Sequence, residues 1–130
     1  MKFNSAGTRQ WTKTVSSDNG DDAYGIAIDS NNNVYITGYT TGILDGTNAG
    51  IWDAFLRKYD SDGAILWTKQ LGTTKDDRAF GASTDSSNNV YVTGYTGYNL
   101  AGTSKGGHDA FLRKYDSAGA ILWTKQLVST

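Results

Sequence analysis

The sequence repeats itself with a period of 56 residues. Three tryptophans in the same local context mark the spacing, namely Trp11, Trp67 and Trp123. The segment 53–71 returns at 109–127 with a single difference, Asp62 in the first copy and Ala118 in the second. A fixed period of this length is typical of repeat architectures, in which each unit buries its apolar surface against a neighbouring unit. The repeat therefore constrains the fold more than any local motif does.

The composition predicts an all-β protein with many tight turns. The chain has no proline, and all 13 acidic residues are aspartate, so glutamate, a good helix former, is absent. Aspartate and asparagine favour turns and caps, and the 16 glycines supply further turn positions. Aromatic and β-branched residues, which favour strands, are frequent.

Charge and cysteine content exclude several functional classes. A net charge of −1 argues against a nucleic-acid-binding surface, and the 12 basic residues are too dispersed for a membrane-binding patch. No apolar run reaches membrane-spanning length, and no cysteine offers a disulfide or thiolate ligand. We expect no cofactor. Because residues 1–7 lack the apolar core of a signal peptide, we expect a cytoplasmic protein or an excised or engineered piece, and location stays open.

Each period contains four strand-like segments separated by turn residues. The expected strands of the first complete unit are 23–29, 33–40, 53–60 and 64–71. In the second unit they recur at 79–85, 89–96, 109–116 and 120–127. Apolar residues occupy both faces of several strands, which favours sheets that are packed on both sides.

The N-terminal segment is in phase with the repeat. Residues 2–7 align with 58–63, and residues 8–15 match the fourth strand of a unit. We therefore divide the chain into a partial unit that carries a turn and an outer strand (1–15), a first unit (16–71) and a second unit (72–130).

The order of these motifs resembles the SBBP-type β-propeller repeat. The motifs that carry the resemblance are Asn-Val-Tyr-Ile-Thr-Gly-Tyr-Thr at 33–40, Asp-Ala-Phe-Leu-Arg-Lys-Tyr-Asp at 53–60 and Leu-Trp-Thr-Lys-Gln-Leu at 66–71. The resemblance runs from Lys2 to Leu127. It implies that each unit is a four-stranded blade with its first strand innermost. It also implies a bacterial parent family whose members are often extracellular or on the cell surface.

The resemblance further implies which side chains pack between blades. Large apolar residues on the third and fourth strands would do so: Phe55, Leu56, Tyr59, Trp67, Phe111, Leu112, Tyr115 and Trp123. The innermost strands of the two units differ, since Ile26 and Ile28 correspond to Ala82 and Thr84. We expect the two units to pack differently at these positions.

The blade number predicts assembly. Propellers usually have about 4–8 blades, and a unit cannot bury its apolar faces alone. We expect identical chains to associate head to tail into a closed ring, with six blades in a trimer or eight in a tetramer. One fourth strand per chain is then surplus, and it could swap between subunits, add as a fifth strand or stay disordered.

The aspartates of the turns are weak candidates for a calcium site. Asp18 and Asp21 precede the first strand of the first unit, and Asp77 occupies the corresponding place in the second. Calcium prefers six to eight oxygen ligands. The alternative is that these carboxylates cap their own turns, and we expect no metal.

The two long loops are where the units differ most, and loops on a rigid scaffold often carry function. They run over 41–52 and 97–108 and offer a candidate ligand site, for glycans for example. Its residues would be Trp52, Tyr98, Asn99 and His108. The alternatives are sequence drift in a tolerant loop and, for an enzyme, chemistry that would rest on aspartate pairs alone. We expect no enzyme: the sequence predicts a structural, self-assembling propeller piece of natural or designed origin, or alternatively a ligand-binding module.

Overall fold

The computed structural model describes residues 1–128, which form ten β-strands and no helix. Nothing in this part of the chain is a helix of the length and apolar character that spanning a membrane requires. The strands are β1 (Lys2–Phe3), β2 (Arg9–Trp11), β3 (Asp21–Ile28), β4 (Val34–Thr40), β5 (Asp53–Tyr59), β6 (Ile65–Leu71), β7 (Asp77–Thr84), β8 (Val90–Thr96), β9 (Asp109–Tyr115) and β10 (Ile121–Leu127). The all-β prediction is confirmed.

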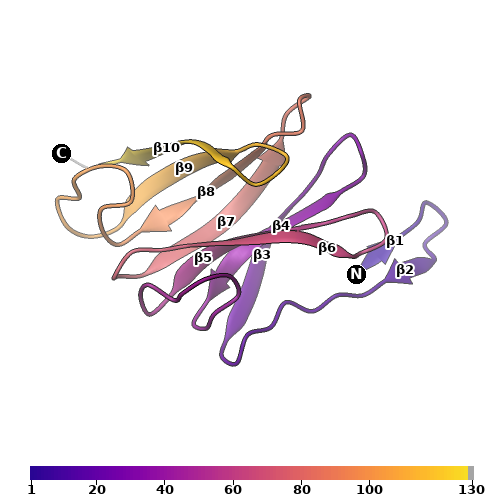
Figure 1. Cartoon of the computed structure of the whole chain (residues 1–130), viewed down its shortest axis with the longest axis horizontal. Coiled ribbons are helices and arrows are strands. Elements are labelled where there is room, and N and C mark those ends of the chain that lie inside the picture. The colour runs from indigo at the N-terminus through magenta and orange to yellow at the C-terminus, as the bar shows by residue number, and fades with distance from the viewer. Residues whose placement is uncertain (129–130) are drawn as a thin grey trace.

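The strands form two four-stranded antiparallel sheets and one short hairpin. The first sheet has the order β3-β4-β5-β6 and the second β7-β8-β9-β10, so each sheet is a meander in chain order. β1 and β2 form a separate N-terminal hairpin. The two sheets lie against each other, with the N-terminal hairpin at one end of the molecule and β10 at the other (Figure 1).

The turns between strands have the conformations that their residues favour. Asn32 and Asn88 have φ near 61°, in the left-handed region that asparagine tolerates. Gly63 and Gly119 have φ of 85° and 87° at the hairpins that end the third strand of each sheet. These four positions recur with the 56-residue period, so the same turn chemistry sets the register of both sheets.

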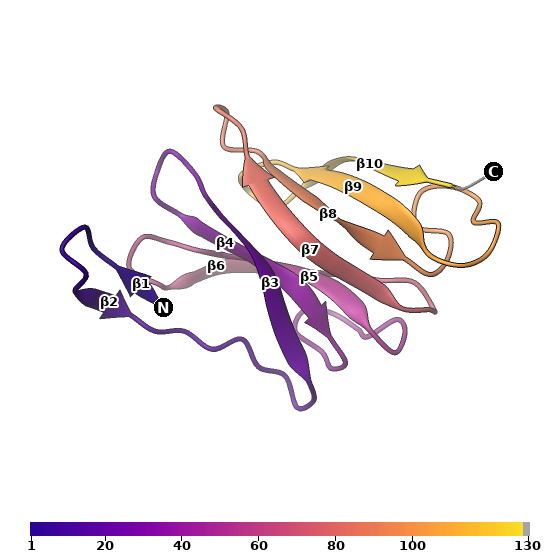
Figure 2. The ribbon, with the colours of Figure 1, turned by 180° about the vertical axis from the view of Figure 1, so that it is seen from behind.

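The first strands of the two sheets approach each other closely. β3 and β7 run side by side across the middle of the molecule (Figure 2). A core of buried side chains lies between the sheets, and both sheets contribute to it: Tyr35, Ala54, Leu56, Leu71, Ala79, Val90, Val92, Phe111 and Tyr115. The core is therefore the junction between the sheets, as expected for repeat units that bury apolar surface against a neighbour.

Each sheet has two faces, which we name by chain direction. The trailing face of the first sheet points toward the second sheet and carries Tyr35, Leu56 and Trp67. The leading face of the second sheet meets it with Val92 and Tyr115. The leading face of the first sheet and the trailing face of the second sheet point outward.

The N-terminal hairpin lies against the first sheet as β5 and β6 lie against the second. The indole nitrogen of Trp11 donates to the carbonyl oxygen of Ser61 at 3.0 Å, and that of Trp67 donates to Ser117 at 3.2 Å. The hairpin thus occupies the place of the two outer strands of a preceding sheet.

The expected outer strand over 8–15 is shorter in the structure. It is confined to Arg9–Trp11, because within residues 1–128 it pairs with the two-residue β1 alone. The sheets themselves span 21–71 and 77–127, within the predicted second and third segments. Residues 129 and 130, which the third segment includes, lie outside the described residues.

Substitution of Gly25 by alanine tests the close approach of β3 to β7. A Cβ at Gly25 would lie 2.8 Å from a methyl group of Thr37 in the same sheet. It would also lie 3.0 Å from two backbone atoms of the second sheet, the Cα of Gly81 and the carbonyl oxygen of Phe80. Since backbone atoms cannot rotate away, we expect a loss of about 1–3 kcal/mol in the free energy of unfolding. Gly81→Ala is the matched control, because its Cβ would meet only a methyl group of Thr93, at 3.1 Å. Urea unfolding measures both, and equal losses would contradict the assigned contact.

Candidate functional site

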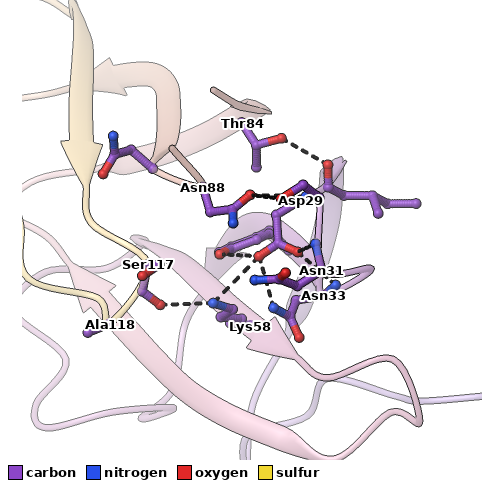
Figure 3. A network of polar contacts seen from close by, with 12 residues as sticks. Asp29, Asn31, Asn33, Lys58, Thr84, Asn88, Ser117 and Ala118 are labelled. Atoms are coloured by element: carbon purple, nitrogen blue, oxygen red, sulfur yellow. Dashed lines mark hydrogen bonds and ion pairs between the residues drawn. The ribbon is translucent and has the colours of Figure 1, made fainter. Parts of the chain in front are cut away.

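The most highly connected polar group in the junction is Asp29, at the end of β3. Its carboxylate accepts hydrogen bonds from the amide of Asn33 at 2.9 Å and from the hydroxyl of Tyr35 at 3.0 Å. The ammonium of Lys58 lies 3.6 Å away, and both charged side chains are buried. Figure 3 shows Asn33 and Lys58 pointing toward the carboxylate of Asp29. A buried ion pair with this many hydrogen bonds fixes the positions of the β3–β4 turn and of β5.

This network continues across the junction into the second sheet (Figure 3). Lys58 donates to the carbonyl oxygen of Ser117 at 2.9 Å, and the hydroxyl of Thr84 donates to the carbonyl oxygen of Ile28 at 2.9 Å. The side-chain oxygen of Asn88 accepts from the hydroxyl of Ser30 at 2.8 Å. These contacts come from the ends of strands and from turns, so they fix how the two sheets are positioned relative to each other.

The second sheet carries the same ion pair on its outward face. Lys114 lies 3.2 Å from Asp85, and both side chains are partly exposed. Asn89 and Tyr91 donate to Asp85 as their counterparts do to Asp29. The second sheet therefore carries an equivalent network. This network is partly exposed to solvent, whereas the one in the first sheet is buried.

The pKa directions follow these environments. Burial works to raise the pKa of Asp29, but the hydrogen bonds from Asn33 and Tyr35 outweigh it and hold the pKa below its ordinary value. The hydrogen bond from the side chain of Asn89 leads in lowering the pKa of Asp85. The pKa of Lys114 is raised, first by its hydrogen bond with Tyr91 and then by Asp85. Both aspartates are therefore held as carboxylates at neutral pH.

A second contact across the junction joins Arg78 to two aromatic rings of the first sheet. Its guanidinium lies 4.5 Å from the ring centre of Tyr39 and 4.7 Å from that of Trp52. The two rings pack edge to face at 4.8 Å. A cation held over aromatic faces contributes about 0.5–2 kcal/mol. Trp52, a predicted ligand residue, is thus part of the contact between the sheets.

The corresponding place in the second sheet holds His108. Its ring lies 4.2 Å from that of Tyr95, on the outward face. Trp52 and His108 therefore occupy equivalent positions of different sheets and do not meet in one site. A cavity of about 290 Å³ does bring His108 near Ile51, the neighbour of Trp52, between the two long loops.

The other two predicted ligand residues lie at the start of the second loop. Tyr98 is exposed, and its carbonyl oxygen accepts from the amide of Gln126 at 3.0 Å. The side-chain oxygen of Asn99 accepts from the backbone nitrogen of Ser104 at 2.6 Å, so it holds its own loop together. Neither residue lines the cavity beside His108.

The candidate calcium residues organise turns. The carboxylate of Asp21 accepts from the hydroxyl of Ser17 at 2.9 Å, and that of Asp77 accepts from Thr73 at 2.8 Å. Asp18 is exposed. Within residues 1–128, no three acidic or histidine side chains are grouped as a metal site requires.

Some equivalent residues of the third and fourth strands differ in exposure between the sheets, although the strand sequences are the same. Leu56 is fully buried, whereas Leu112 is 37% exposed. Leu71 is 5% exposed and Leu127 is 69% exposed. Trp123 is 37% exposed, because among residues 1–128 no third sheet provides the turn that it would meet. Phe55, Tyr59, Phe111 and Tyr115 are buried.

The leading face of the first sheet is also open. Ile26 is 64% exposed and Ile28 is 57% exposed. With Trp11 and Phe3 of the N-terminal hairpin they line a cavity of about 260 Å³. The hairpin covers the outer part of this face and leaves the inner part, near β3, uncovered.

Four-stranded antiparallel meanders that stack face to face, with their first strands together, are the blades of a β-propeller. The chain belongs to the SBBP family, a β-propeller repeat, whose model matches residues 10–45 and 66–101. Each match begins in an outer strand and ends after the second strand of the following sheet, so the family unit straddles a junction between blades.

A further relative agrees with this assignment. An uncharacterized WD repeat-containing protein of Acanthamoeba polyphaga mimivirus is 29% identical over 153 residues. The match covers 95% of this chain and 11% of the relative, so the chain spans about a tenth of the length of this relative.

Proposed function

We propose that the chain is a structural propeller unit without catalytic activity, whose two outward faces pack against further copies of itself in a closed ring. The observation that carries the proposal is the pair of open faces. Side chains that form the core in the first sheet recur, exposed, on the trailing face of the second. The face that would receive them exposes Ile26 and Ile28.

The energy of such a contact is large on the scale of one small domain. Burial of a leucine or isoleucine side chain contributes about 1.5–3 kcal/mol. Leu112, Leu127, Ile26 and Ile28 alone then account for several kcal/mol, comparable with the total stability of about 5–15 kcal/mol of an ordinary domain. Their exposure favours association over persistence as a single chain.

A head-to-tail contact closes when the rotation per chain divides the circle. Two sheets per chain give six blades in a trimer and eight in a tetramer, both within the usual range of about 4–8.

Light scattering coupled to size-exclusion chromatography tests the proposal. At micromolar concentrations and above, we expect the mass of a trimer or a tetramer of the 14.0 kDa chain. A single-chain mass at every accessible concentration, with cooperative thermal unfolding, would contradict it.

The cavity between the long loops supports a second candidate function, the binding of a small polar ligand such as a glycan. Ile51 offers an apolar surface and His108 a hydrogen-bonding group there. A glycan array followed by thermal shift assays of any hit tests this candidate, with His108→Ala as the control that should lose the shift.

A further inference from the structure

The carbonyl oxygens of Ser61 and Ser117 accept equivalent hydrogen bonds. Within the chain, Ser117 accepts from the indole of Trp67 and from the ammonium of Lys58, at 3.2 Å and 2.9 Å. Ser61 accepts two donors of the same kinds from the N-terminal hairpin, Trp11 at 3.0 Å and Lys2 at 2.7 Å.

The turn that contains Ser61 also contacts a tryptophan in the same way as the turn that contains Ser117. A Cβ at Gly119 would lie about 3 Å from the ring of Trp67, and one at Gly63 would lie equally close to the ring of Trp11. In each turn the glycine has positive φ, and the absence of a Cβ lets the indole ring approach the turn closely. Trp11 therefore occupies the place that the tryptophan of a preceding blade needs.

We propose that the N-terminal hairpin is an intramolecular cap that a second copy of this chain displaces. This inference rests on the proposed head-to-tail assembly. In the assembled state Trp123 of the second copy lies on Gly63 and donates to Ser61, and Lys114 takes the place of Lys2. The leading face of the first sheet then receives four strands in place of two short ones.

The relative strength of the pairings determines which hairpin gives way. β9 and β10 have seven residues each and pair along their length, and β9 also pairs with β8. β1 and β2 have two and three residues and pair only with each other. Release of the N-terminal hairpin breaks few hydrogen bonds, whereas release of β9 and β10 would dismantle half of the second sheet.

The cap also leaves buried surface to be gained. It does not cover Ile26 and Ile28, which remain more than half exposed beside the cavity. Their counterparts Ala82 and Thr84 lie against the first sheet, and Thr84 donates across the junction. Because an incoming sheet covers these positions and the hairpin does not, the second copy gains apolar contact that the cap lacks.

Hydrogen-bonding complementarity points to a copy of this chain as the partner. Arg78 of the second sheet stacks on Tyr39 and Trp52 of the sheet before it. The residue equivalent to Arg78 in the first sheet is Asp22, and the residue equivalent to Trp52 in the second sheet is His108. Head-to-tail docking therefore places the carboxylate of Asp22 against the imidazole of His108.

Both residues of this expected pair are exposed, although the side chain of Asp22 also hydrogen-bonds to Tyr39 of its own sheet. Asp22 is exposed on β3, and His108 is exposed beside Tyr95. Arg78 and Trp52 meet inside the chain, and Asp22 and His108 take their places between chains. A carboxylate can accept a hydrogen bond from the imidazole, so this substitution keeps the two sides complementary.

Two tryptophan substitutions at equivalent positions test the displacement, because they should act in opposite directions. Trp11→Ala removes the anchor of the cap, and we expect the concentration at half-assembly to fall about tenfold. Trp123→Ala removes the anchor of the incoming blade, and we expect that concentration to rise about tenfold. Sedimentation velocity over a concentration series measures both, and circular dichroism checks that each variant keeps its strands.

The outcomes separate this inference from the proposed function. If the wild type assembles and Trp11→Ala has no effect or weakens assembly, the displacement is overturned and the ring still stands. A weakening effect would mean that the N-terminal hairpins are exchanged between chains. A wild type and a Trp11→Ala variant that both stay single chains at all concentrations would overturn the ring and the displacement together.

The docking register has its own test in the same assay. We expect Asp22→Ala and His108→Ala each to raise the concentration at half-assembly about fivefold, and the double variant to raise it no further than either alone. Independent, multiplying effects of the two substitutions would overturn the pairing of Asp22 with His108.

Discussion

Replacement of Leu56 by alanine is expected to lower the free energy of unfolding by about 2–5 kcal/mol, whereas the same change at Leu112 is expected to lower it by less than about 1 kcal/mol. The two leucines occupy the same position of the same strand sequence. Leu56 is fully buried in the core between the sheets, and Leu112 is 37% exposed on the trailing face of the second sheet. Only the first substitution leaves a cavity.

Urea unfolding followed by tryptophan fluorescence measures this difference. The protein should be dilute enough for sedimentation to show single chains, since assembly would bury Leu112 as well. At higher concentration, Leu112→Ala is expected to weaken assembly. Equal losses for the two variants under dilute conditions would contradict the assigned difference in burial.

Asp29→Asn is expected to lower the free energy of unfolding by about 3–5 kcal/mol, because it leaves the buried ammonium of Lys58 without its carboxylate. The amide also brings a second donor against the amide of Asn33. Asp85→Asn is the matched control: the equivalent pair with Lys114 is partly exposed, so its loss should be much smaller. Similar losses of unfolding free energy in the two variants would show that the buried ion pair stabilises the fold no more than the partly exposed one.

The effect of Asp29→Asn should also depend on pH. The pKa of Asp29 lies below its ordinary value in the folded protein, so the folded state binds fewer protons than the unfolded chain. The stability contributed by this carboxylate is therefore fully present above about pH 4, near the unfolded value, and is lost as the pH falls through the lower folded value. The difference between wild type and variant should shrink from pH 7 to pH 2. A difference that grows in acid would contradict the assigned direction.

Local chemistry was sufficient to predict the strands and turns. The strands begin and end within two residues of the predicted bounds in both sheets. The largest difference is at the first strand of each sheet, which starts at Asp21 rather than residue 23 in the first sheet and at Asp77 rather than residue 79 in the second. Asp21 and Asp22 pair with Thr40 and Tyr39 of β4, and this pairing across a bulge overrides the preference of aspartate for turns.

Contacts between units could not be predicted in the same way. Trp52 is in a loop and aromatic, which made it a candidate ligand residue, yet its partner Arg78 comes from the following unit. Asp22 is the residue of the first unit that is equivalent to Arg78 in the second. The repeat therefore gave no sign that a cation would occupy this position beside Trp52. The different exposure of Leu56 and Leu112 is also invisible in two identical strands, because it depends on which neighbour is present.

The identity of the two outer hairpins has a consequence for folding kinetics. β4 and β8 differ only at Ile36 and Val92, and they pair with β5 and β9 in the same register. Side-chain chemistry therefore hardly distinguishes the native pairing of β4 with β5 from a skipped pairing of β4 with β9. Loop closure does, since the much longer loop of the skipped pairing costs about 1–2 kcal/mol more. We expect refolding to pass through a minor trapped population in which the intervening unit is looped out.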